Sequence, residues 1–183
     1  MILWIILGII ILIALFFFIY YNKFVRLENQ IENSLAQIDV QLKKRADLVP
    51  NLLAAVKGYM KHERKIISEV TKARKELINA KDIDSKIKAG NKLQSALKSI
   101  FAIAENYPNL KSNENFLQLQ QELAAIEDKV AYARQYFNDG IMSYNTLLTT
   151  IPGKWFANLY GFKKKDYLKI PAEERAVPKI NFD

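Results

Sequence analysis

Residues 2–21 form an apolar run, ILWIILGIIILIALFFFIYY, that contains no charged side chain. As an α-helix with a rise of about 1.5 Å per residue, this run extends roughly 30 Å, which matches the hydrocarbon core of a bilayer. A single segment can satisfy its own backbone hydrogen bonds in lipid only as a helix. The run therefore predicts a transmembrane anchor, and the rest of the chain must fold beside a membrane.

A cleaved secretory signal peptide is the main alternative for the same run. Such a peptide has a basic segment, then a shorter apolar core, and small residues at its cleavage site. Here no basic residue precedes Ile2, and residues 16–21 are mostly bulky aromatics. The sequence therefore favours a retained anchor in residues 1–22.

Aromatic and basic residues flank the apolar run as expected at the two bilayer interfaces. Trp4 lies near one end, and Tyr20 and Tyr21 lie at the other. Lys23 and Arg26 follow the run, whereas no Lys or Arg precedes it. Because basic residues accumulate on the cytoplasmic side, these charges predict a single-pass protein of the inner membrane. Its N-terminus is expected outside and its C-terminal domain in the cytoplasm.

The chain beyond the anchor has the length of one domain with a single core. It has no cysteine, so disulfides, thiol nucleophiles and thiolate metal sites are excluded. The net charge of +8 suits an anionic membrane face or a nucleic acid, although a solvated basic surface has the same composition. We expect a helical bundle in residues 23–151 and an aromatic, basic tail in residues 152–183.

Apolar residues recur at helical spacing through most of residues 24–150, and no stretch has the alternation of a β-strand. The pattern predicts helices over residues 84–106 and 113–150 after an earlier helical stretch. Asp82 or Asp84 is expected to cap the first of these two helices, because a short acidic side chain accepts hydrogen bonds from free backbone N–H groups. The fold class is therefore all-α.

Pro50 interrupts the earlier helical stretch, because a proline inside a helix removes the hydrogen bond to residue 46 and costs around 3 kcal/mol. The phase of the apolar stripe favours a kink, since the stripe continues past Pro50 into Leu52 without a slip. Length favours an end, since one unbroken helix over residues 24–80 would leave the last helix partly unpacked. We therefore predict a helix boundary at Pro50, with Asp47 as the N-cap of the second helix. The result is an antiparallel up-and-down four-helix bundle.

Three motifs resemble those of a known family: R-x-D-L-V-P-N-L in residues 45–52, Y-P-x-L-K-x-N-x-x-F in residues 107–116, and R-x-x-x-N before Y-N in residues 134–145. On these motifs the chain is similar, over nearly its whole length, to the LemA family of bacterial membrane proteins. The resemblance implies a single-pass N-terminal anchor and a four-helix bundle, with no assigned enzymatic activity. Lys44 stands where the family usually has an arginine, and Phe137 where it has a tyrosine.

No residue set in the sequence points to catalysis. The pair His62 and Glu63 begins like a zinc-binding H-E-x-x-H motif, but residue 66 is Ile and the chain has one histidine. Serine and threonine lack a partnering base, and no glycine-rich loop is present to hold a phosphate. We therefore expect no catalytic residue, no metal and no cofactor.

Arg45 and Arg134 fall on or beside the apolar stripes of their helices. Either their stems pack while the guanidinium groups reach water, or the side chains are partly buried and paired. We predict that at least one forms a salt bridge to another helix. The candidate partners are Asp39, Asp47, Glu105 and Glu127, and the amides that could join this structural polar network are Asn51, Asn138 and Asn145.

The tail differs from the rest of the chain, because aromatic residues alternate with lysines there. It could cover the open end of the bundle, contact lipid headgroups, or stack on single-stranded nucleic acid, which we expect least. A fourth helix returns the chain to the bilayer, so we predict that residues 154–169 touch the headgroups. The membrane-interface candidates are Trp155, Tyr160, Lys163, Lys164 and Lys165. Residues 172–183 are expected to be extended.

These expectations describe a membrane-anchored, non-enzymatic scaffold or adaptor of LemA type. The alternatives are a lipid-binding, membrane-organising module and an accessory subunit of a membrane enzyme such as a protease. The expected partners are the lipid bilayer and an unidentified membrane or cytoplasmic protein. We expect no nucleic acid partner, and the sequence leaves the oligomeric state open.

Overall fold

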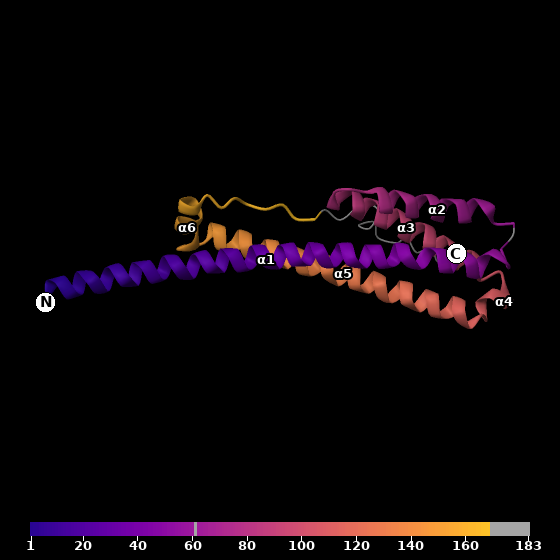
Figure 1. Cartoon of the computed structure of the whole chain (residues 1–183), viewed down its shortest axis with the longest axis horizontal. Coiled ribbons are helices and arrows are strands. Elements are labelled where there is room, and N and C mark those ends of the chain that lie inside the picture. The colour runs from indigo at the N-terminus through magenta and orange to yellow at the C-terminus, as the bar shows by residue number, and fades with distance from the viewer. Residues whose placement is uncertain (61, 169–183) are drawn as a thin grey trace, which may run out of the picture. The chain divides into compact units, whose positions relative to one another are not determined.

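The computed structural model describes residues 1–60 and 62–168, and the expected extended residues 172–183 lie outside this part. All regular structure in the described residues is helical (Figure 1), which confirms the all-α class. The helices are α1 (Ile2–Lys57), α2 (Arg64–Asn79), α3 (Ile83–Ala104), α4 (Pro108–Lys111), α5 (Glu114–Thr149) and α6 (Gly153–Tyr160).

The chain divides into two compact units. The first, which we call the anchor unit, comprises Met1–Glu32 and Gln135–Asp183, and the second, the bundle unit, comprises Asn33–Arg134. Helices α1 and α5 contribute residues to both units.

In the bundle unit, the second half of α1 packs with α2, α3 and the first part of α5. Successive long helices run in opposite directions (Figure 1), which confirms the expected up-and-down four-helix bundle. The helices form because apolar side chains recur on one face of each, and these side chains make the core. The fully buried core residues from the four helices include Ile38, Leu42, Val49, Leu52, Val70, Leu93, Ile100 and Val130.

The expected N-cap of α3 is also present. The Asp82 carboxylate accepts a hydrogen bond from the backbone N–H of Ser85 at 2.9 Å, which satisfies one of the free donors in the first turn. At the start of α5, the Asn113 side-chain oxygen accepts from the N–H of Phe116 at 3.1 Å. These caps fix where the two helices begin.

The prediction that Pro50 marks a helix boundary is wrong, because Pro50 lies inside α1. Asp47 lies in the same helix, so it is not an N-cap. The helix ends at Lys57, and the N–H of Met60 still donates to the carbonyl of Val56 at 2.9 Å. The chain does reverse direction before residue 80, as the helix lengths require, but it does so between α1 and α2, after Lys57 rather than at Pro50.

The carbonyl of Ala46, which loses its helical donor to Pro50, is satisfied from another helix. The Nε–H of Arg74 in α2 donates to this carbonyl at 2.8 Å. A charged donor makes a strong hydrogen bond to a backbone carbonyl, so the contact offsets part of the cost of the proline. Burial acts in the same direction, since Val49 and Leu52 on either side are fully buried. These contacts explain why the helix continues.

The first part of α1 is the candidate membrane span. The most apolar window of this helix has a mean hydropathy of 3.3 and is 0% buried within the protein. A core helix of a soluble domain is mostly covered by other elements, whereas this window is bare. Packing begins only near Phe17, and Phe24 is fully buried. The phenyl ring of Phe24 contacts Tyr144 of α5 and Phe162, with ring centroids 5.6 Å and 4.5 Å apart.

Candidate functional site

Arg45 ties three helices of the bundle unit together. Its side chain is 1% exposed and forms an ion pair with Glu127 of α5 through Nη2. Its Nη1 donates to the backbone carbonyl of Gly90 in α3 at 3.3 Å. A Cβ atom at Gly90 would lie 2.7 Å from Cδ2 of Leu42, so the missing side chain allows α3 to approach α1 this closely. Glu127 is one of the four carboxylates that the sequence offered as partners.

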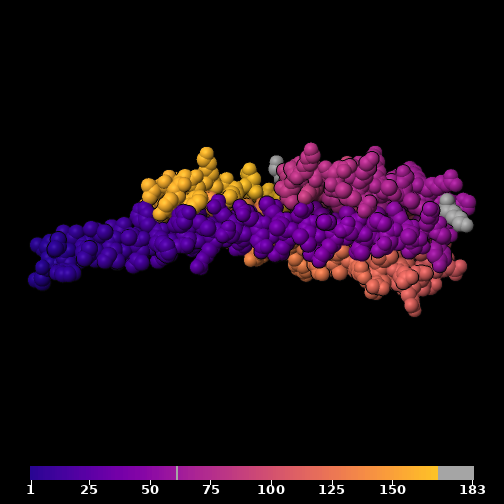
Figure 2. Space-filling model, in the orientation of Figure 1, coloured from indigo at the N-terminus to yellow at the C-terminus, as the bar shows by residue number. Residues whose placement is uncertain are grey.

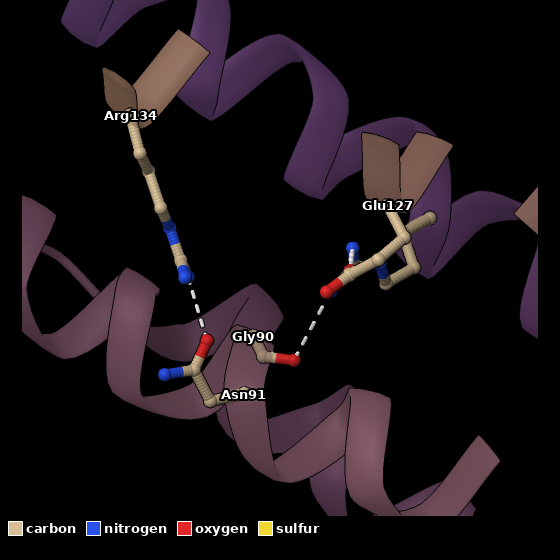
Figure 3. Close-up of polar contacts among 5 residues, drawn as sticks. Gly90, Asn91, Glu127 and Arg134 are labelled. Carbon is tan, nitrogen blue, oxygen red and sulfur yellow. Dashed lines mark hydrogen bonds and ion pairs between the residues drawn. The ribbon is translucent and has the colours of Figure 1, made fainter. Parts of the chain in front are cut away.

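Arg134 of α5 makes the neighbouring contact to α3. Its Nη2 donates to Oδ1 of Asn91 at 2.6 Å, so its partner is an amide rather than a carboxylate (Figure 3). Burial is the largest effect on Arg45 and lowers the pKa of its guanidinium, Glu127 opposes that change, and the positive charge of Arg134 adds to it. An arginine titrates so far above neutral pH that Arg45 keeps its charge.

This cluster is only partly satisfied. Among the described residues, four buried polar atoms of the cluster and its surroundings have no hydrogen-bond partner: Gln41 Oε1, Arg45 Nε, Asn91 Nδ2 and Arg134 Nε. Of its two guanidinium groups, only that of Arg45 is paired with a carboxylate. An unpaired buried polar group destabilises a fold, so the cluster fixes helix register at some cost in stability. The arrangement contains no nucleophile with a base, and residues 1–60 and 62–168 contain no group of three metal-ligating side chains.

Two residues that the sequence analysis assigned to the network lie elsewhere. Asp47 and Glu105 are exposed, and among the described residues no side-chain hydrogen bond or ion pair joins either carboxylate to Arg45 or Arg134. Arg74 and Asn91, which do bond to other helices, were not among the expected residues. A usable signal for Arg74 was present, because a proline in a helix leaves the carbonyl four residues earlier in need of a donor.

Asn138 and Asn145 belong to a second polar site, in the anchor unit. The side chain of Asn145 donates to the carbonyl of Lys165 at 2.9 Å and accepts from its N–H at 3.0 Å. Asn138 accepts from the N–H of Leu168 at 3.0 Å. The two asparagines are two helical turns apart, about 10.5 Å, and three extended residues cover about 10 Å. The spacing of the two asparagines along α5 therefore equals the spacing of their backbone partners, Lys165 and Leu168, in the segment after α6.

Lys165 is a structural residue of this site. Its Nζ lies 2.9 Å from Oε1 of Glu28 and 5.1 Å from the ring centroid of Tyr144. The Tyr144 hydroxyl donates to the same carboxylate oxygen at 3.5 Å. Burial, with a smaller effect of Glu28, raises the pKa of Tyr144 to about 12. The half-buried Lys165 thus makes contacts within the protein, whereas Lys163 and Lys164 are exposed.

Helix α6 packs one face on the end of the apolar run. Phe156 stands edge-on to Phe17 and stacks on Tyr20, each at a centroid distance of 4.8 Å. Tyr160 contacts Tyr21 at 5.2 Å. Figure 2 shows this last described part of the chain, in yellow, lying against α1.

Two glycines, one at each end of α6, set its position. A Cβ atom at Gly153 would lie 2.0 Å from the carbonyl oxygen of Leu147, so only glycine permits this turn after α5. Gly161 ends the helix with a φ of 74°, a left-handed conformation that glycine adopts without strain. The opposite face of α6 is bare: Trp155 is 63% exposed and Leu159 is 64% exposed.

These features define a class of protein: a helical bundle attached to one N-terminal apolar helix that is long enough to cross a membrane. The model of the LemA family matches residues 34–182. The chain therefore belongs to the LemA family, which confirms the expected family.

Three relatives are similar to the chain. The magnetosome protein MamQ of Magnetospirillum gryphiswaldense is 26% identical over an alignment of 173 residues, and the match covers 80% of this chain and 64% of MamQ. Protein LemA of Metamycoplasma hominis is 27% identical over an alignment of 150 residues, and the match covers 79% of this chain and 68% of that protein. The magnetosome protein MamQ 1 of Paramagnetospirillum magneticum is 23% identical over 175 residues. The chain spans slightly less than two thirds of the length of the MamQ proteins.

Proposed function

We propose that this protein is a non-enzymatic scaffold of the bacterial inner membrane. Residues 2–21 anchor it, and the bundle unit binds a membrane or cytoplasmic protein. The observation that carries the proposal is that α1 continues from the apolar run into the bundle as one helix, with no loop between them. A domain that follows its anchor directly in the chain stays attached to the membrane, where a scaffold acts.

The polar chemistry of the bundle unit also supports a scaffold. The buried guanidinium of Arg45 pairs with Glu127 on another helix, and Arg134 and Arg74 also bond to other helices. Side chains engaged in this way hold helix register, whereas an enzyme needs polar groups that converge on a substrate. The basic flank after the span supports a cytoplasmic bundle with the N-terminus outside.

Photocrosslinking in bacterial membranes tests the scaffold. A photoreactive amino acid is placed at exposed apolar positions on three helices of the bundle, Val40, Ile78 and Leu117. Exposed polar positions, Lys72 and Lys98, serve as matched controls. We expect the same protein adduct from one or more apolar positions in native membranes and none from the controls. Adducts with lipid alone would contradict the scaffold and favour a membrane-organising module.

A further inference from the structure

The exposed face of α6 lies at a defined depth relative to the apolar run. Its buried face contacts Phe17, Tyr20 and Tyr21, the last residues of that run. Phe17 is about 6 Å along the helix from Tyr21. If residues 2–21 cross the bilayer, α6 is therefore fixed at the boundary between acyl chains and headgroups.

The composition of α6 suits this boundary. Trp155 and Leu159 are four residues apart, so they share one face of the helix, and both are more than half exposed. Tryptophan is enriched at this depth because its ring is apolar and its N–H is polar. Exposed lysines stand at both ends of the helix: Lys154 near its start, and Lys163 and Lys164 just after its end.

We infer that α6 is an interfacial helix that inserts Trp155 and Leu159 into the bilayer beside the span, while Lys163 and Lys164 bind anionic lipid headgroups. The inference rests on the proposed anchor and adds a binding surface for anionic phospholipid. It also narrows the expected set of headgroup contacts to Lys163 and Lys164, because Lys165 is paired with Glu28. The aromatics divide between two roles: Phe156 packs on α1, whereas Trp155 faces lipid.

Tryptophan fluorescence of the full chain in lipid nanodiscs tests the inference. The chain has two tryptophans, so Trp4→Phe leaves Trp155 as the only reporter of α6, and Trp155→Phe leaves Trp4 as a reporter of the span. The nanodiscs contain brominated lipid, which quenches tryptophan on contact, either as phosphatidylglycerol or as phosphatidylcholine in the same proportion. We expect Trp155 to be quenched, and more strongly by the brominated anionic lipid.

The lysine variants test the headgroup contact. Each lysine near the surface is expected to enrich anionic lipid about five-fold, the equivalent of about 1 kcal/mol. Lys163→Ala with Lys164→Ala should therefore remove the preference of Trp155 for anionic lipid. The adjacent exposed pair Lys43 and Lys44 in α1, changed in the same way, carries the same loss of charge and should leave the preference intact.

The outcomes separate this inference from the proposed anchor. Quenching of Trp4 without quenching of Trp155 would overturn the interfacial helix and leave the anchor standing. Absence of quenching at both would overturn both proposals. Equal quenching of Trp155 by the two brominated lipids, or an unchanged preference in the Lys163 and Lys164 variant, would overturn the binding of anionic headgroups.

Discussion

Removing Glu127 should destabilise the bundle far more than removing Arg45, its partner. Glu127→Leu leaves the Arg45 guanidinium, 1% exposed, without its counter-charge. Breaking a buried ion pair in this way costs about 3–5 kcal/mol, and we expect about 3 because Glu127 is itself 38% exposed. Arg45→Met instead leaves a carboxylate that water can reach. We expect that variant to lose about 1–2 kcal/mol, the cost of weakened packing and hydrogen bonds.

Thermal unfolding of the full chain in detergent micelles, followed by circular dichroism, measures this asymmetry. A loss of about 3 kcal/mol corresponds to a decrease in Tm of about 6–12 °C for a protein of this size. The double variant Arg45→Met with Glu127→Leu should melt above Glu127→Leu alone, because no buried charge is stranded.

The half-exposed pair Lys86 and Asp39 is the matched control in the same unit, with Nζ and Oδ1 2.5 Å apart. Asp39→Leu should change the free energy of unfolding by less than about 1 kcal/mol. Equal losses for Glu127→Leu and Asp39→Leu would refute the argument from burial. A double variant that melts below both single variants would refute the pairing.

Three further outcomes follow from single contacts. Arg74→Met should lower the free energy of unfolding, measured by thermal unfolding, by about 1–2 kcal/mol. In a chain that already carries Pro50→Ala, the same change should cost almost nothing, because that substitution returns a backbone donor to the carbonyl that Arg74 satisfies. Gly90→Ala should cost about 1–3 kcal/mol, and Leu42→Ala should reduce that cost by removing the clash. The pKa of Tyr144 is raised in the fold, so its contribution to stability is complete below a pH of about 10 and is lost as the pH rises to about 12. Tyr144→Phe should therefore flatten the decrease in Tm over that pH range.

The sequence was sufficient to predict α3, α5 and an N-terminal helix long and apolar enough to cross a membrane, because these depend on local patterns. Asp82 could be predicted as a cap because a capping side chain bonds to backbone only three residues away. Arg45 could be placed in the core from its phase on the apolar stripe, but its partner could not be chosen. Four carboxylates were available, and only the register between α1 and α5 brings Glu127 to it.

The prediction at Pro50 failed for a related reason. The phase of the apolar stripe favoured a kink, the matching of helix lengths favoured an end, and the sequence could not show the contact from another helix that supports the continuous helix. Arg74 provides that contact from α2, which no local pattern could reveal. Lys165 shows the same limit. It follows Lys163 and Lys164 directly in the sequence, but only the fold shows that it pairs with Glu28 and bonds to Asn145.

Cysteine accessibility tests the central claim, an anchor in the membrane with a cytoplasmic bundle, most directly. The chain contains no cysteine, so two single-cysteine variants give unique labelling sites: one with a cysteine inserted after Met1, ahead of the apolar run, and one with Ser95→Cys at an exposed position of the bundle. Both are treated with a membrane-impermeant maleimide in spheroplasts. The account predicts that both variants sediment with membranes, that the N-terminal cysteine is labelled in intact spheroplasts, and that Ser95→Cys is labelled only after the membrane is permeabilised. Labelling of Ser95→Cys in intact spheroplasts would contradict it.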